Sequence, residues 1–218
     1  MEEAWLRYLE LIDERPDLFA DSNELEIVLD KKAVEEFEHK SGKTIGVAYR
    51  SRFNTLVVDL VRNPKGDVFA YERLVQTSLG TGVVSVPIHN GRFILLKQYR
   101  HSMRNYQFAF PRGYGEDGLA AAENVRKELS EELSASMGGV TPLGTVVANS
   151  GISGDAVEVF LCEVLSYRTD VGHEEIVDSV ELSRDELVQW IADGRINDGF
   201  TLSAFELFQS KDAVSPTV

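Results

Sequence analysis

The spacing of apolar residues changes from a helical period to a strand period near residue 44. Before that point Trp5, Leu9 and Ile12 recur at helical spacing, and Pro16 ends the first of two expected helical segments. After it, apolar and polar residues alternate, which is typical of strands with one buried face. The expected strands cover 27–29, 44–49, 56–61, 68–76, 82–88, 93–99, 143–148, 157–165 and 176–182.

Turn and cap residues place the remaining elements. Asn90-Gly91 predicts a tight hairpin between the strands 82–88 and 93–99. A Gly-rich loop at 113–118 precedes an expected helix from Leu119 to about Leu133. The apolar stripe of that helix is expected to consist of Ala122, Val125, Leu129 and Leu133.

The C-terminal region is expected to contain two further helices. Ser183 and Glu186 have the spacing of a capping box, which opens a helix that runs to Ile191. A last helix covers 200–208, with Asp198 or Thr201 as its cap, and 210–218 is expected to be a mobile tail. A strand-rich centre with helices before, within and after it predicts an α+β fold or an α/β/α sandwich.

Composition and charge narrow the classes of partner. The 218 residues include 22 basic and 36 acidic side chains, for a net charge of −14. That charge repels phosphate backbones, so no nucleic-acid partner is expected, although a divalent cation can still join carboxylates to a small phosphorylated ligand. No apolar stretch is long enough to span a bilayer, and the single Cys162 cannot build an internal disulfide framework. We therefore expect a cytoplasmic protein without membrane contact.

The segment 113–135 contains the residues with the clearest chemistry. On a helix Glu128, Glu131 and Glu132 stand at i, i+3 and i+4 and share one face. Three adjacent carboxylates suit a hard cation such as Mg²⁺ or Mn²⁺, and the preceding Gly-rich loop lets backbone amides approach a ligand. In a chain this acidic, the same triplet is also typical of a solvated helix face, so the triplet alone does not decide between the two interpretations.

This segment resembles the box of the Nudix hydrolases, G-x5-E-x7-R-E-U-x-E-E-x-G-U. The residues that match in register are Gly113, Glu128, Leu129, Glu131 and Glu132. Three positions depart from the box: Leu119 replaces its first Glu, Lys127 its Arg, and Ser134 its second Gly. In the family the first Glu and the Arg orient the metal-binding carboxylates. We therefore expect metal binding to persist with reduced turnover, and Leu119 to have joined the packing of the helix.

Further segments resemble ADP-ribose pyrophosphatases, so the similarity runs from about residue 68 to 208. Residues 96–100 are similar to their L-x-Q-Y-R strand, and 108–113 to the E-L-P-A-G segment that leads into the box. Asn149-Ser150-Gly151 lies where these enzymes carry S-P-G, and 190–202 resembles their C-terminal G-x-I-x-D-x-x-T segment.

The resemblance implies a role for particular residues. Glu128 and Glu132 would be the main metal ligands, with Glu131 and the backbone carbonyl of Arg112 in support. The implied substrate-binding residues are Arg73, Arg100, Gly113 and Gly151, and each arginine can equally be a surface residue of its strand. A catalytic Glu, acting with Glu128, is expected in the loop 169–175, where Glu174 and Glu175 are both candidates.

Taken with the fold pattern, the resemblance implies an α+β protein whose Nudix α/β/α sandwich with a mixed sheet occupies 81–210. A helical N-terminal segment and a small antiparallel sheet, 1–80, would precede it and form a homodimer, and 211–218 would be the tail. The implied activity is Mg²⁺- or Mn²⁺-dependent hydrolysis of the pyrophosphate bond of a small nucleoside diphosphate-linked substrate, ADP-ribose or a nucleotide sugar. Two alternatives stay open: a dinucleoside polyphosphate hydrolase, and a Nudix sensor that binds a nucleotide without turnover.

Overall fold

The computed structural model describes residues 2–20 and 22–214, and these form two compact units. One unit comprises the residues up to Ser78 together with Asn149–Asp155, and the other comprises Leu79–Ala148 and the residues from Ala156 onward. Within the described ranges no helix is both long and apolar enough to cross a membrane. The chain therefore passes from the first unit to the second near residue 78 and returns to the first for one short segment.

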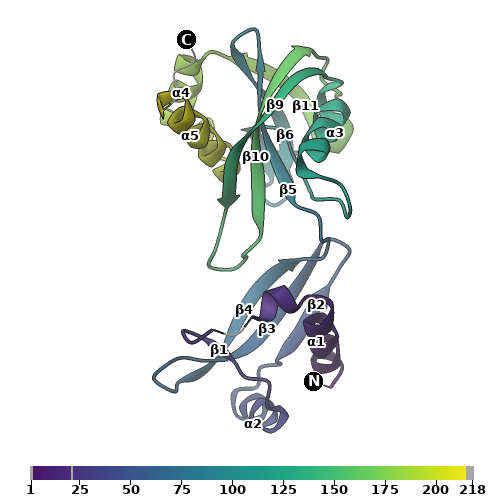
Figure 1. Cartoon of the computed structure of the whole chain (residues 1–218), viewed down its shortest axis with the longest axis vertical. Helices are drawn as coiled ribbons and strands as arrows, with labels where there is room; N and C mark the ends of the chain where they lie inside the picture. The colour runs from purple at the N-terminus through teal and green to yellow at the C-terminus, as the bar shows by residue number, and fades with distance from the viewer. Residues whose placement is uncertain (1, 21, 215–218) are drawn as a thin grey trace. The chain divides into compact units, whose positions relative to one another are not determined.

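The first unit is a small antiparallel sheet with helices packed on it (Figure 1). Its central strand β3 pairs along its whole length with β4, and with β2 and β1 on its other edge. The expected strands are present, and 68–76 has the predicted bounds. The elements of this unit are α1 (Glu2–Glu14), the 3-10 turn η1 (Pro16–Phe19), β1 (Glu26–Ile27), α2 (Lys31–Ser41), β2 (Gly46–Arg50), β3 (Asn54–Arg62) and β4 (Val68–Gln76).

A buried polar cluster fixes the N-terminal segment on this sheet. The Tyr8 hydroxyl of α1 donates to Asp59 of β3, and Asp59 also accepts from the Arg73 guanidinium, with a shortest distance of 2.6 Å. Arg73 donates to the carbonyl of Leu18 at 2.7 Å, and its guanidinium lies 4.6 Å from the centre of the Phe19 ring. Burial and the neighbouring Asp59 carboxylate raise the pKa of Tyr8, so the hydroxyl stays protonated and can donate.

The second unit is built on a seven-stranded mixed sheet. Its strands follow the order β11-β6-β5-β10-β9, and only the pair β5 and β10 is parallel. Two short strands complete it: β7 pairs with β6, and β8 pairs with β5. The bounds are β5 (Gly82–His89), β6 (Arg92–Arg100), β7 (Asn105–Ala109), β8 (Arg112–Gly113), β9 (Ser136–Val147), β10 (Ala156–Ser166) and β11 (Ile176–Leu182).

Helices cover both faces of this sheet, so the expected α/β/α sandwich is confirmed (Figure 1). On one face α3 (Ala121–Leu133) packs with Val125, Leu129 and Leu133. On the other face α4 (Arg184–Ala192) and α5 (Gly199–Val214) contribute the core residues Leu187, Ala204 and Phe205.

Strands β5 and β6 separate soon after their turn, which the sequence did not predict. They pair only at Ile88–Phe93 and His89–Arg92. Beyond these pairs the edge of β5 is occupied by other groups: Val83 and Val84 pair with β8, and the backbone N–H of Ser85 donates to the carbonyl of Pro111. The segment 105–113 therefore lies between the two strands and brings the start of the Gly-rich loop into the middle of the sheet.

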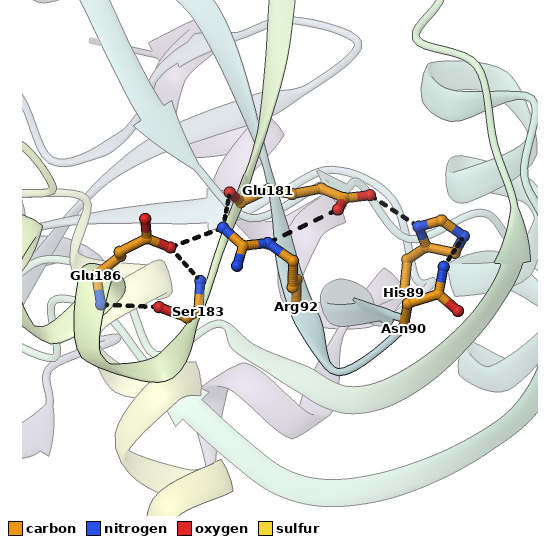
Figure 2. A network of polar contacts seen from close by, with 6 residues as sticks. All are labelled: His89, Asn90, Arg92, Glu181, Ser183 and Glu186. Atoms are coloured by element: carbon orange, nitrogen blue, oxygen red, sulfur yellow. Dashed lines mark hydrogen bonds and ion pairs between the residues drawn. The ribbon is translucent and has the colours of Figure 1, made fainter.

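A polar network braces the turn end of this hairpin (Figure 2). His89 is 2.7 Å from the carboxylate of Glu181, while Arg92 donates to the Glu181 carbonyl at 3.0 Å and to Glu186 at 2.7 Å. Glu186 also accepts from the backbone N–H of Ser183, whose hydroxyl in turn accepts from the Glu186 N–H. The predicted capping box is thus confirmed, and it is tied to the hairpin.

Three expectations about the helices are wrong. The Ala122 side chain is exposed and the neighbouring Ala121 packs on the core instead, because Ala121 continues the four-residue spacing of Val125, Leu129 and Leu133. Leu119 lies before α3 and is half-buried, so it does not extend the stripe of that helix. The last helix continues to Val214, into the expected tail, and the end of that tail, 215–218, lies outside the described residues.

Candidate functional site

The carboxylate helix and the strand before the Gly-rich loop meet in very close contact. A Cβ atom built on Gly113 would lie 1.9 Å from Oε1 of Glu128, a distance that no real side chain allows. Glycine is therefore required at 113 for the Glu128 carboxylate to rest against the backbone of β8. This contact places Glu128 of α3 beside the segment that separates β5 from β6.

The Gly-rich loop between β8 and α3 is held at several points. A Cβ on Gly115 would lie 2.0 Å from the backbone of Gly80, so these two chain segments also meet through glycine. The carboxylate of Asp117 accepts from the N–H groups of Leu79 and Gly80, at 2.7 and 3.2 Å. The buried Asn124 of α3 donates to the carbonyl of Tyr114 at 2.8 Å. The loop is therefore tied both to the start of the second unit and to the helix that follows it.

Two of the three predicted helix carboxylates are withdrawn from water. Glu132 is only 2% exposed and Glu128 is half-buried, whereas Glu131 is exposed. Burial, with repulsion from Glu131 and Glu174, raises the pKa of Glu128 to about 7. Burial, followed by repulsion from Glu128 and Glu174, raises the pKa of Glu132 to about 8. Neighbouring acids that oppose each other's ionisation need a positive charge if both are to be charged at neutral pH.

The donor set fits a hard cation. Oε2 of Glu132 is buried and has no hydrogen-bond partner among the described residues. Among all the residues that the structure describes, no three His, Cys, Asp or Glu side chains lie close enough together to hold a metal ion by themselves. Glu128 and Glu132 would therefore supply two side-chain ligands for Mg²⁺ or Mn²⁺, and such ions commonly complete their shell with water and substrate phosphate oxygens.

Lys127, which replaces the Arg of the box, has two carboxylate partners. It forms an ion pair with Glu116 of the Gly-rich loop, and it lies 3.5 Å from Glu131 on the next turn of α3. The Glu116 partner raises the pKa of Lys127, so the ammonium stays charged. Glu116 thus provides a carboxylate for this cation although position 119 holds Leu.

Two arginines approach the carboxylate pair from the strands. The charges of Arg100 in β6 and Arg112 in β8 both oppose the pKa rise of Glu132. Burial, then the charge of Arg112, lowers the pKa of Arg100, and its Nε atom is buried with no hydrogen-bond partner among the described residues. Arg112 lies 3.2 Å from the buried carboxylate of Asp198. The site therefore brings together carboxylates that repel one another and guanidinium groups that repel one another.

Glu174 and Glu175 are distinguished by their surroundings. The carboxylate of Glu174 contributes to the raised pKa of both Glu128 and Glu132, which places its charge close to theirs. Gln98 of β6, a buried side chain, donates to the carbonyl of Glu174 at 2.6 Å. Glu174 and Glu175 have positive φ angles of 43° and 60°, so the chain turns sharply here. Both side chains are exposed.

Two predicted substrate-binding residues lie in the first unit. Arg73 is the half-buried partner of Asp59 and of the Leu18 carbonyl described above. Gly151 belongs to the segment Asn149–Asp155, where its carbonyl accepts from the hydroxyl of Tyr71 at 3.0 Å. In the structure both residues therefore make contacts that stabilise the first unit, and their role in binding stays a prediction.

Three polar residues near the site were given no role in it by the sequence. Asp198 was expected as a helix cap and as the Asp of the G-x-I-x-D-x-x-T segment. It is a cap: its Oδ2 accepts from the N–H and the hydroxyl of Thr201. Gln98 was expected only as the Gln of the L-x-Q-Y-R strand, and Asn124 was not singled out. A polar residue inside an apolar stripe or strand was the available signal, because such residues are buried only when they have a partner.

Comparison with known proteins agrees with this geometry. No family model matches the chain. The methanol dehydrogenase activator of Bacillus methanolicus is 26% identical over 181 residues, covering 82% of this chain and 96% of that protein. The ADP-ribose pyrophosphatase of Bacillus subtilis (strain 168) is 24% identical over 189 residues, covering 85% and 96%.

The fold comparison adds the architecture. A crystal structure of an ADP compounds hydrolase matches with a TM-score of 0.68 and 21% identity, and the match covers 77% of this chain and 90% of the other. The sandwich fold agrees with the similarity to these relatives, which covers most of the chain. The box residues gathered around Glu128 agree with it as well. The chain is thus similar to an ADP-ribose pyrophosphatase in sequence and to an ADP compounds hydrolase in fold, and its box residues resemble those of the Nudix hydrolases. In Nudix terms, Ser134 stands where the box has its second Gly: it ends α3 with φ 44° and ψ 38°, the left-handed conformation that favours glycine.

Proposed function

We propose that this protein hydrolyses the pyrophosphate bond of a nucleoside diphosphate-linked substrate, ADP-ribose or a nucleotide sugar. The observation that carries the proposal is the buried pair Glu128 and Glu132, whose raised pKa values and unpartnered oxygen call for a cation. Two of the relatives support it through their names, ADP-ribose pyrophosphatase and ADP compounds hydrolase.

A metal ion has a definite place in this proposal. Mg²⁺ or Mn²⁺, held by Glu128 and Glu132 with support from Glu131 and the Arg112 carbonyl, would supply positive charge to the diphosphate and acidify a water molecule. Glu128 is thus proposed both as a metal ligand and as a catalytic residue.

The chain's own side chains provide the remaining functions. Arg100 binds diphosphate oxygens, since its buried guanidinium retains an unpaired Nε. Gly113 has no side chain, which lets the Glu128 carboxylate rest against its backbone, and the diphosphate binds beside this contact. Glu174 or Glu175 takes the proton from the water that attacks phosphorus, and the position of the Glu174 charge near the carboxylate pair favours Glu174.

Two other functions are supported by specific observations. The Phe110-Pro111-Arg112-Gly113 segment also suits a dinucleoside polyphosphate hydrolase. Leu119 and Lys127, both departures from the box, suit a sensor that binds a nucleotide without turnover. A panel containing ADP-ribose, nucleotide sugars and dinucleoside polyphosphates, incubated with Mg²⁺ and followed by release of nucleoside monophosphate, separates the three. Turnover of none of them, together with binding by calorimetry, would support the sensor.

The quaternary structure and location are further proposals. We propose a homodimer formed through residues 1–80, because an antiparallel sheet with unpaired edges is a ready surface for pairing. Light scattering over a range of concentrations tests it, and a monomer throughout would contradict it. A cytoplasmic location is proposed on the basis of the single cysteine, Cys162, which is buried and unbridged.

A further inference from the structure

The side chain of Arg112 is held firmly in a position where the resembling motif has alanine. Its guanidinium lies 3.2 Å from Oδ1 of Asp198 and 4.9 Å from the centre of the Phe200 ring. Three-quarters of the Arg112 side chain and nearly all of the Asp198 side chain are shielded from water. An arginine in such surroundings loses little further conformational freedom when it binds a ligand.

Asp198 is itself fixed by the fold. Its Oδ2 accepts from the N–H of Thr201 at 2.9 Å and from the Thr201 hydroxyl at 2.8 Å. The hydroxyl of Thr201 accepts from the N–H of Phe110, also at 2.9 Å. This chain of bonds joins the start of α5 to the segment that carries Arg112. The carboxylate that holds the guanidinium therefore cannot move independently of the strand from which Arg112 extends.

Arg112 and Arg100 lie near each other, and the Asp198 carboxylate pairs with only part of the Arg112 guanidinium. Arg112 and Arg100 are close enough for the first to lower the pKa of the second, and Arg100 keeps a buried Nε without a hydrogen-bond partner among the described residues. Within the described ranges, Asp198 is the one residue that forms an ion pair with Arg112. A guanidinium carries five N–H donors, so both arginines retain donors for a further acceptor. Two like charges that converge in this way suit a multiply charged oxyanion.

We propose that the Arg112 side chain is a second guanidinium ligand for the diphosphate of the substrate, beside Arg100, and that Asp198 is its positioning residue. The inference rests on the proposed hydrolysis and deepens it, because it assigns the side chain of a residue whose backbone carbonyl alone was implied. A planar guanidinium can contact two oxygens of one phosphate, which a lysine cannot do. With one guanidinium for each phosphate, Arg100 and Arg112 together favour substrates with two adjacent phosphates over those with one.

The direct test is to measure the binding of inorganic pyrophosphate by calorimetry with Mg²⁺ present. Arg112→Ala keeps the backbone carbonyl and should weaken pyrophosphate binding about 10- to 100-fold, the range of a charge-assisted hydrogen bond. Arg112→Lys should recover only part of that loss. Arg126→Ala is the matched control, because Arg126 is an exposed arginine of α3 that donates to the carbonyl of Gly138. Arg112→Gln serves in place of the alanine variant if the latter does not fold.

Kinetics with ADP-ribose separate positioning from folding. Arg112→Ala should raise KM more than it lowers kcat, and Asp198→Asn should do the same to a smaller degree with an unchanged midpoint of thermal unfolding. In the double variant Asp198→Asn should add little, because it acts through Arg112. Equal pyrophosphate affinity of the wild type and Arg112→Ala would overturn the assignment. Absence of hydrolysis by the wild type would instead contradict the proposed function, while the pyrophosphate measurement would still test Arg112.

Discussion

Lys127 of the carboxylate helix pairs with Glu116 of the Gly-rich loop, although the box would place its acid at residue 119. The loop is therefore tied to α3 from a different position. We predict that Glu116→Gln lowers kcat for ADP-ribose about 3- to 10-fold. In this variant Lys127 keeps its ion pair with Glu131 alone, so the carboxylates of α3 are held less firmly in place. The charge exchange Glu116→Lys with Lys127→Glu should recover part of the loss.

The same pair decides the effect of restoring the box. Leu119→Glu with Lys127→Arg should not raise activity above the wild type, since Glu116 already occupies the partner position. Steady-state kinetics on the wild type and the three variants measure both effects. A gain of activity in the restored box, with no loss in Glu116→Gln, would show that the departures are uncompensated.

Gly113 offers a way to disturb the site without disturbing the core. The methyl group of Gly113→Ala would meet the outer atoms of the Glu128 side chain, which can rotate away at small cost in stability. We expect the variant to unfold within a few degrees of the wild type but to lose at least ~10-fold in kcat, because Glu128 is displaced. Gly154→Ala is the control, since a Cβ there meets nothing within 4 Å. A large loss of thermal stability with intact kcat would contradict the account.

Local features of the sequence predicted much of the fold and the carboxylate face. Glu128 and Glu132 share a face because helix geometry depends on residues four apart, and the strands 68–76 and 176–182 have their predicted bounds. Contacts between distant residues were not predictable in this way. The ion pair of Arg112 with Asp198, the insertion of 105–113 between β5 and β6, and the return of 149–155 to the first unit depend on tertiary packing.

The departures at the ends of α3 show the same limit. A leucine at 119 predicts an apolar stripe, yet the helix begins after it. Ser134 adopts the left-handed conformation that the glycine of the box would take more easily, so the backbone kept its path when the side chain changed. Neither outcome follows from propensity alone, because tertiary contacts on both sides of α3 fix its length.

The identity of the general base is a separate prediction. Glu174→Gln should lower kcat about 10²-fold or more, and Glu175→Gln should have a clearly smaller effect, because the Glu174 charge contributes to the raised pKa of both Glu128 and Glu132. Steady-state kinetics of the two variants measure both effects. The reverse order of the two variants would assign the base to Glu175.

Glu132 gives a pH-dependent prediction about stability. Its pKa is about 8 in the folded protein and near the ordinary value of 4.5 in the unfolded chain, so between these two pH values the folded state holds a proton that the unfolded state has released. Folding free energy is therefore lost progressively as the pH rises from about 4.5 to about 8. In EDTA at pH 8.5, Glu132→Gln should be more stable than the wild type by ~1–2 kcal/mol, a rise of ~2–8 °C in the unfolding midpoint.

The pH comparison provides its own control. At pH 4 the two proteins should unfold at nearly the same temperature, because Glu132 is protonated in both states of the wild type. Addition of Mg²⁺ at pH 8.5 should raise the midpoint of the wild type more than that of Glu132→Gln. A variant less stable than the wild type at pH 8.5 in EDTA would show that the charged carboxylate has a favourable partner in the folded protein.

The most direct measurement is the release of AMP from ADP-ribose by the purified protein with Mg²⁺, compared with Glu128→Gln, Glu132→Gln and the control Glu123→Gln, which changes an exposed residue of the same helix. The account predicts Mg²⁺-dependent AMP release by the wild type and Glu123→Gln, and a loss of at least ~10²-fold in the other two variants with their folds intact. Near-normal release by either Glu128→Gln or Glu132→Gln would contradict it.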